Sequence, residues 1–205
     1  FKDALRRIKD VSPSAKCVLI LRNPIERAIS AYHYAVKFNY ETLPIQRAFE
    51  AEEERIYSGD IRTLSELTYK THGLYYNQLM EFYNIFDREQ LHIILYEDIS
   101  NNPKKVMIDL FNYLGVDNNF EPEFRMLNNT GKVKSKLVQK IGFGDNPIRN
   151  FFVRNVLKGV LSEEKWAKLR FRVIHANTVE KKSNYSSEID ASTKVELQNF
   201  FKEDI

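Results

Sequence analysis

The sequence between Lys16 and Tyr32 is KCVLILRNPIERAISAY. Its first part is a short apolar run bounded by turn-forming residues, which is typical of a β-strand buried on both faces. Asn23 is a favourable N-cap and Pro24 a favourable first residue of a helix. The apolar residues that follow recur at helical spacing, and they are Ile25, Ile29, Tyr32 and Val36. The pattern therefore predicts a buried strand followed at once by an amphipathic helix.

The same pattern of strand and helix occurs a second time. Residues 91–96 form another apolar run, and Asn102 with Pro103 begins a helical pattern that ends at Gly115. Further helical patterns cover residues 45–57, 74–86, 148–157, 163–175 and 191–202. Strands separated by helices pair in parallel through crossover connections. We therefore predict an α/β fold with a doubly wound parallel sheet and flanking helices, in a single domain over residues 1–205.

The composition excludes several classes of protein. The 205 residues include 31 Lys and Arg against 28 Asp and Glu, a net charge of +3, so a nucleic-acid partner is not expected. No apolar run approaches the roughly 20 residues that span a bilayer, and no signal peptide is visible. We therefore expect a soluble, cytoplasmic protein. The single Cys17 lies in the first apolar run and is expected to be a buried, unreactive thiol.

Arg22 and Ser30 indicate a binding site for an anion. Arg22 ends the first predicted strand, and Ser30 lies on the second turn of the helix that follows. Ligands of open α/β sheets bind at the carboxyl ends of the strands. A guanidinium, a hydroxyl and the positive end of a helix together favour an anion such as phosphate. The alternative is that Arg22 pairs with a nearby carboxylate such as Glu26.

Charge is unevenly distributed along the chain. Residues 131–170 hold ten Lys and Arg against three acidic residues, whereas residues 41–60 hold six acidic residues against two Arg. A basic stretch of this kind either forms a solvated face or binds an anionic ligand. The acidic stretch argues against the binding of a polyanionic chain there.

The chain resembles sulfotransferases that use 3′-phosphoadenosine 5′-phosphosulfate (PAPS), including the heparan sulfate sulfotransferases and their bacterial relatives. The residues that fall as in the family's 3′-phosphate-binding motif are Arg22, Pro24, Arg27, Ser30 and Tyr32. Segments 73–75, 95–99, 102–103 and 111–116 are similar to the family in the same order. The similarity runs from about Ala4 to Lys136.

The resemblance implies a P-loop-NTPase-like fold, PAPS as the sulfuryl donor and no metal. It implies that Arg22 and Ser30 bind the 3′-phosphate of the cofactor and that Tyr96 lies near the adenine. Lys132 and Lys134 fall where the family has a late loop that closes over the nucleotide, so we expect residues 131–140 to form a mobile loop. The implied acceptor is a hydroxyl or amine of a glycan or of a small molecule.

One part of the family's pattern is missing from this sequence. In the family, a strand, a Gly-rich turn and a Lys together form a P-loop before the Arg motif, and the catalytic Glu or His also precedes that motif. Neither feature lies between Phe1 and Arg22, so we expect the N-terminal strand, the P-loop and the base upstream of Phe1 in a longer protein. His72 is the candidate base within the chain, although a His before a helix more often acts as a cap.

We therefore expect a PAPS-dependent sulfotransferase, with two alternatives. A P-loop phosphotransferase would share the sheet, but it would need a Gly-Lys-Ser/Thr turn to bind phosphates and Mg²⁺. A non-catalytic anion-binding module would account for the missing P-loop without any further segment. No group of residues has the spacing of a metal site. The oligomeric state stays open.

Overall fold

The computed structural model describes residues 2–124, 131–135, 138, 162–180 and 189–204. The chain divides into two compact units. The first consists of Phe1–Arg27, Thr71–Leu127 and Val195–Ile205, and the second of Ala28–Lys70 and Asn128–Lys194. Two helices, α2 (Pro24–Lys37) and α12 (Ala191–Phe201), contribute residues to both units.

The first unit is built around two parallel strands. Strand β1 (Cys17–Leu21) pairs with β2 (Leu91–Leu95), and the register runs from Cys17 opposite Leu91 to Leu21 opposite Leu95. The two predicted strands and the α/β class with a parallel sheet are thus confirmed. The prediction that the strands are buried on both faces is wrong for the described residues, because side chains of one face are partly exposed: Val18, Ile20, Ile93 and Leu95 are 41%, 55%, 38% and 48% exposed. Within the described residues this sheet has two strands. The doubly wound arrangement and the P-loop-NTPase-like fold stay predictions.

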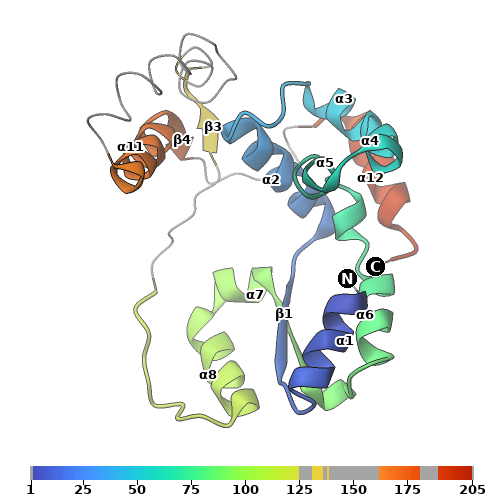
Figure 1. Cartoon of the computed structure of the whole chain (residues 1–205), viewed down its shortest axis with the longest axis vertical. Coiled ribbons are helices and arrows are strands. Elements are labelled where there is room, and N and C mark those ends of the chain that lie inside the picture. Colours follow the sequence, from blue (N-terminus) through green and yellow to red (C-terminus); the bar gives the residue numbers. More distant parts are fainter. Residues whose placement is uncertain (1, 125–130, 136–137, 139–161, 181–188, 205) are drawn as a thin grey trace. The chain divides into compact units, whose positions relative to one another are not determined.

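Helices flank the strands of the first unit. Figure 1 shows β1 between the pair α1 (Lys2–Val11) and α6 (Tyr76–Tyr83) and, on the other side, α8 (Pro103–Leu114). The core under α1 and α6 consists of Leu5, Phe82 and Phe86, and Cys17 packs against it. Cys17 is therefore a half-buried free thiol that packs against this core, and not the fully buried thiol that the sequence predicts.

The helix predicted between Asn102 and Gly115 is confirmed. The Asn102 side chain accepts a hydrogen bond from the backbone N–H of Lys105, and Gly115 ends α8 with a left-handed φ of 75°. The ring of Tyr113 stacks on His92 of β2, and its hydroxyl donates to the carbonyl of Cys17. A Gly meets no steric penalty at such a φ, which is why the helix stops there.

Two local predictions in the first unit are wrong in their bounds. The second strand ends at Leu95, and Tyr96 begins the short helix α7 (Tyr96–Asn101). The helix predicted over residues 74–86 is shorter, because the 3₁₀ turn η1 (Thr71–Gly73) precedes it and α6 covers Tyr76–Tyr83. A second 3₁₀ turn, η2 (Arg88–Gln90), leads into β2.

The second unit contains α3 (Ile45–Glu50), α4 (Glu52–Ser58) and α5 (Ile61–Glu66). The single helix predicted over residues 45–57 is wrong, since the chain breaks at Ala51. Ala51 itself keeps helical dihedral angles, with φ −71° and ψ −8°, and Glu52 begins α4. The Glu52 side chain is buried, and one carboxylate oxygen accepts hydrogen bonds from the backbone N–H groups of Tyr69 and Lys70, at 2.9 and 2.8 Å.

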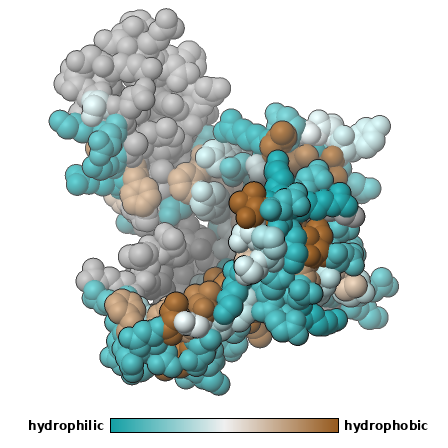
Figure 2. Space-filling view, turned by 60° about the horizontal axis from the view of Figure 1, so that its bottom comes forward, coloured by the Kyte–Doolittle hydropathy of each residue, from teal (hydrophilic) through white to brown (hydrophobic). Residues whose placement is uncertain are grey.

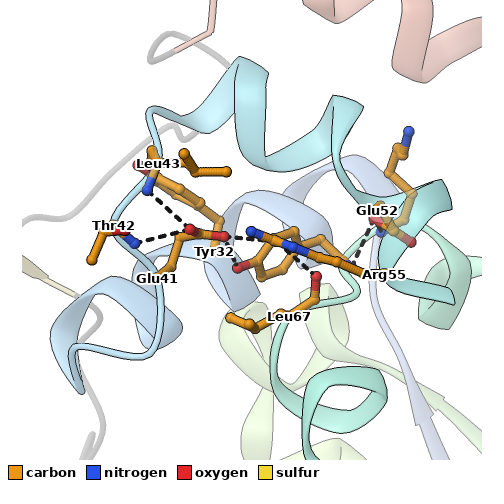
Figure 3. Close-up of polar contacts among 9 residues, drawn as sticks. Tyr32, Glu41, Thr42, Leu43, Glu52, Arg55 and Leu67 are labelled. Carbon is orange, nitrogen blue, oxygen red and sulfur yellow. Dashed lines mark hydrogen bonds and ion pairs between the residues drawn. The ribbon is translucent and has the colours of Figure 1, made fainter. Parts of the chain in front are cut away.

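A buried carboxylate organises the same unit (Figure 3). One oxygen of Glu41 accepts hydrogen bonds from the backbone N–H groups of Thr42 and Leu43. The other accepts from the Arg55 guanidinium at 2.7 Å and from the Tyr69 hydroxyl at 2.8 Å. Both oxygens of this buried group are therefore satisfied, as a charge removed from water requires.

The remaining described elements of the second unit are β3 (Gly131–Val133), β4 (Thr178–Glu180) and α11 (Glu163–Ala176). Helices α11 and α12 confirm the predictions over 163–175 and 191–202, whereas the predicted helix 148–157 lies outside the described residues. No helix of the described ranges is long and apolar enough to cross a membrane. Figure 2 shows a mostly hydrophilic described surface with small separate hydrophobic patches.

Candidate functional site

The site begins where β1 passes into α2. The Asn23 side chain accepts hydrogen bonds from the backbone N–H groups of Ile25 and Glu26, at 3.1 and 3.2 Å, so Asn23 is the N-cap that the sequence predicts. Pro24, which is buried, begins the helix. Arg22 lies between the last residue of β1 and this cap. Its side chain therefore leaves the backbone at the carboxyl edge of the sheet.

The parallel register brings Arg22 to Tyr96. Because Leu21 is opposite Leu95, the next residue of each segment is Arg22 on one side and Tyr96 on the other. The Arg22 guanidinium carbon lies 4.8 Å from the centre of the Tyr96 ring, which is within the range of a cation–π contact. Two predicted cofactor-binding residues thus lie together in the first unit.

Arg22 also faces a carboxylate. Its guanidinium lies 3.7 Å from the Glu26 carboxylate, one turn along α2, and the two side chains are 21% and 23% exposed. The pairing that the sequence leaves open as an alternative is therefore present. The nearest atoms of this ion pair are beyond hydrogen-bonding distance. An anion with better geometry can replace Glu26 as the partner of Arg22.

The backbone N–H groups at the start of α2 are already used within the protein. Those of Ile25 and Glu26 donate to Asn23, and that of Arg27 donates to the Asn23 carbonyl. The Asn23 N–H donates to the Glu97 carboxylate at 3.1 Å. An anion at this edge would consequently depend on the Arg22 guanidinium and on the helix dipole, and not on unused N–H groups.

Ser30 lies on the second turn of α2 and is partly buried. Within the described part of the chain, its hydroxyl makes no hydrogen bond, and binding of the 3′-phosphate by Ser30 stays a prediction. Ser30 belongs to the second unit and Arg22 to the first.

The structure changes the expectation for Lys132 and Lys134. The loop predicted over 131–140 begins as strand β3, in which Lys132 pairs with Val179 of the antiparallel β4. The Lys134 ammonium donates at 2.9 Å to the carbonyl of Ala176, the last residue of α11. A cation at a helix C-terminus is favourable, because the last carbonyls of the helix carry partial negative charge. The loop prediction is wrong for residues 131–133, and nucleotide binding by the two Lys stays a prediction.

His72 lies in η1 and is exposed. The next residue, Gly73, is packed so closely that a Cβ there would lie 2.9 Å from the Phe201 ring. Within the described residues, no group of three or more His, Cys, Asp and Glu side chains is arranged to hold a metal ion. A catalytic role for His72 stays a prediction.

Three polar side chains of the first unit have roles that the sequence patterns do not predict. Glu97 accepts from Asn23, and the Tyr75 hydroxyl donates to the Arg22 carbonyl at 3.0 Å. Asp204 accepts from the backbone N–H of Tyr75 at 2.6 Å. Tyr75 and Glu97 lie in segments that resemble the family, but that resemblance implies no contact for them. Asp204 has no signal in the local sequence, since its partner is 129 residues away.

Comparison with known proteins finds two relatives that are both described as sulfotransferases. The solved structure of a sulfotransferase from Alicyclobacillus acidocaldarius is similar, with a TM-score of 0.57 and 28% identity over 82% of this chain. The membrane-associated sulfotransferase kil1 of Dictyostelium discoideum is 41% identical over 56 residues, or 27% of this chain. The chain covers 63% of the first relative and 12% of the second.

The family model described as the sulfotransferase domain matches residues 5–139. This range includes β1, α2, β2 and α8, and with them Arg22 and Tyr96. The match covers more than half of the chain, so the chain belongs to the sulfotransferase domain family.

Proposed function

We propose that this chain is the nucleotide-binding part of a sulfotransferase that transfers the sulfuryl group of PAPS to an acceptor hydroxyl or amine. Membership of the sulfotransferase domain family and the similarity to the Alicyclobacillus acidocaldarius sulfotransferase support the reaction class. PAPS supplies an activated sulfuryl group, and its 3′-phosphate is the anion that Arg22 would bind.

The observation that carries this proposal is the Arg22 guanidinium beside the Tyr96 ring at the carboxyl edge of two parallel strands. A guanidinium matches the geometry of phosphate through two parallel hydrogen bonds. The partial burial of Arg22 strengthens such a contact, and Glu26 at 3.7 Å is a partner that phosphate can replace. Tyr96 is 44% exposed, so its ring is accessible to an adenine.

Other chain residues contribute to the proposal less directly. We assign the Ser30 hydroxyl a hydrogen bond to the same 3′-phosphate, as the resemblance to the family implies. Lys132 and Lys134 are assigned to the nucleotide as well, and Lys134 would exchange the Ala176 carbonyl for a phosphate oxygen. His72 stays the candidate base within the chain. A Lys-bearing P-loop and a Glu or His base upstream of Phe1 stay predicted.

The acceptor is proposed to be a glycan or small molecule without a dense negative charge. An open depression on the surface of the second unit is lined by Glu50, Glu53 and Glu54 together with Ile56 and Tyr57. Three carboxylates there would repel a polysulfated chain. A cytoplasmic location also stays a prediction.

Calorimetric titration with adenosine 3′,5′-bisphosphate (PAP), the product that PAPS leaves, tests the assignment of Arg22. Replacing Arg22 with Ala removes a partly buried, charge-assisted contact of roughly 2 to 4 kcal/mol, which is about 30-fold to 1000-fold in affinity. Ser30→Ala removes a neutral hydrogen bond of about 1 kcal/mol. The control is Arg47→Ala, which also removes an Arg that pairs with a Glu nearby in the sequence, in this case Glu50.

The expected result is a large loss of PAP affinity for Arg22→Ala and none for Arg47→Ala. An unchanged dissociation constant for Arg22→Ala would refute the assignment. Binding of PAP by the complete protein without transfer of sulfate from PAPS to any of a panel of acceptors would instead favour a non-catalytic module.

A further inference from the structure

The peptide group between Arg22 and Asn23 is held from both ends. Its carbonyl accepts a hydrogen bond from the Tyr75 hydroxyl at 3.0 Å, and its N–H donates to the Glu97 carboxylate at 3.1 Å. A peptide group is planar, so fixing both its carbonyl and its N–H fixes the orientation of that plane. The Cα atom that carries the Arg22 side chain is one of the atoms of this plane. Tyr75 and Glu97 therefore restrict the directions in which the guanidinium can reach.

The backbone of Tyr75 is in turn bound by Asp204, which lies in the turn after α12. One Asp204 oxygen accepts from the Tyr75 backbone N–H at 2.6 Å, and the other accepts from that of Tyr76 at 3.0 Å. These N–H groups belong to the start of α6, where a negative charge is favourable. Asp204 is fixed by a turn in which its own N–H donates to the carbonyl of Phe201, a fully buried residue.

We propose that Tyr75 and Asp204 are positioning residues for the anion bound by Arg22, so that recognition of the 3′-phosphate depends on residues 201–204. This inference rests on the proposed function, because it assumes that Arg22 binds that phosphate. The series of contacts runs from Phe201 and Asp204 to Tyr75, and from the Tyr75 hydroxyl to the Arg22 carbonyl. Every member of the series lies within the first unit.

The chemistry of Tyr75 suits this role. Burial raises the pKa of its hydroxyl above the usual value, although the nearby Arg27 acts in the opposite direction. The hydroxyl therefore keeps its proton near neutral pH and stays a donor to the Arg22 carbonyl. The gain for binding comes from orientation. A guanidinium whose orientation is already restricted before the ligand binds loses less conformational freedom when it forms two hydrogen bonds to phosphate.

Titration of the 205-residue chain with PAP and with AMP, which lacks the 3′-phosphate, tests the inference. Tyr75→Phe removes one hydroxyl and keeps the ring. It is expected to weaken PAP binding by about 2-fold to 10-fold, the equivalent of one neutral hydrogen bond, and to leave AMP binding unchanged. Asp204→Ala is expected to act in the same direction, and Asp204→Asn, which keeps an acceptor oxygen, should restore part of the loss.

Two neighbouring residues provide matched controls. Tyr76→Phe removes an exposed hydroxyl, and Glu203→Ala removes an exposed carboxylate. Neither residue's side chain contacts Arg22 within the described structure, so both variants should keep the wild-type ratio of PAP to AMP affinity. This ratio is measured within one variant, so partial unfolding lowers both affinities and leaves the ratio unchanged.

The outcomes separate this inference from the proposed function. A wild-type chain that binds PAP no more tightly than AMP overturns both. A wild-type preference for PAP that Tyr75→Phe leaves intact overturns the positioning role alone. In an Arg22→Ala background, Tyr75→Phe should cost no further PAP affinity, because its effect passes through Arg22. An equal loss in both backgrounds would also overturn the inference.

Discussion

Replacing Glu41 with Gln tests whether the buried ion pair of the second unit holds that unit together. Glu41 is 4% exposed, and its two oxygens accept four hydrogen bonds (Figure 3). Gln keeps one carbonyl oxygen, but it places an amide NH₂ where two of the donors point. The variant leaves the Arg55 guanidinium, which is 15% exposed, without its counter-charge. Breaking a buried pair in this way costs roughly 3 to 5 kcal/mol.

The chain contains a matched exposed pair. Arg47 and Glu50 lie 2.7 Å apart, the same separation as Arg55 and Glu41, but their side chains are 73% and 58% exposed. Glu50→Gln should therefore change the free energy of unfolding by roughly 0 to 1 kcal/mol. Urea unfolding of both variants gives the two values. If Glu41→Gln lowers the free energy of unfolding by no more than Glu50→Gln does, burial does not decide the strength of these ion pairs.

The same carboxylate predicts how stability depends on pH. Burial by itself raises the pKa of Glu41, but the hydrogen bonds from Arg55, Leu43 and Tyr69 outweigh it and hold the pKa below the usual 4.5. The stabilisation is therefore fully present above pH 4.5 and is lost as the pH falls through the folded-state pKa. The difference in unfolding free energy between wild type and Glu41→Gln should shrink on acidification below pH 4.5. A difference that stays constant or grows would contradict this assignment.

Two further predictions concern packing and nucleotide response. Gly73→Ala should destabilise the chain by roughly 1 to 3 kcal/mol in thermal unfolding, because its Cβ would lie 2.9 Å from the buried Phe201 ring; an unchanged melting temperature would contradict the packing. Backbone amide exchange in residues 131–135 should slow when PAP is added, if Lys132 and Lys134 contact the nucleotide. Identical exchange with and without PAP would place these Lys outside the site.

Local sequence patterns predict the elements that carry the candidate site. The strands β1 and β2 are short apolar runs between turn signals, and α2 and α8 each begin with an Asn-Pro pair. The contact of Arg22 with Tyr96 also follows once the two strands pair in parallel, because each residue comes directly after the last register pair. The Arg22–Glu26 pair, which the sequence leaves open as the alternative to anion binding, is also present.

The features that sequence patterns miss depend on distant partners. The buried Glu52 carboxylate binds the backbone N–H groups of Tyr69 and Lys70, 17 and 18 residues away, which no local propensity reveals. Strands β3 and β4 have three residues each and pair across a long separation, so their apolar pattern is too short to detect. The cap that Asp204 provides for α6 likewise joins the last turn of the chain to a helix 128 residues earlier.

The central claim is that Arg22 and its neighbours recognise a 3′-phosphate on an adenine nucleotide. The most direct measurement is calorimetric titration of the wild-type chain with PAP and, separately, with AMP under the same salt conditions. PAP should bind about 30-fold or more tightly than AMP, because AMP has no 3′-phosphate to form the charge-assisted contact with the Arg22 guanidinium. Equal dissociation constants for the two nucleotides would contradict it.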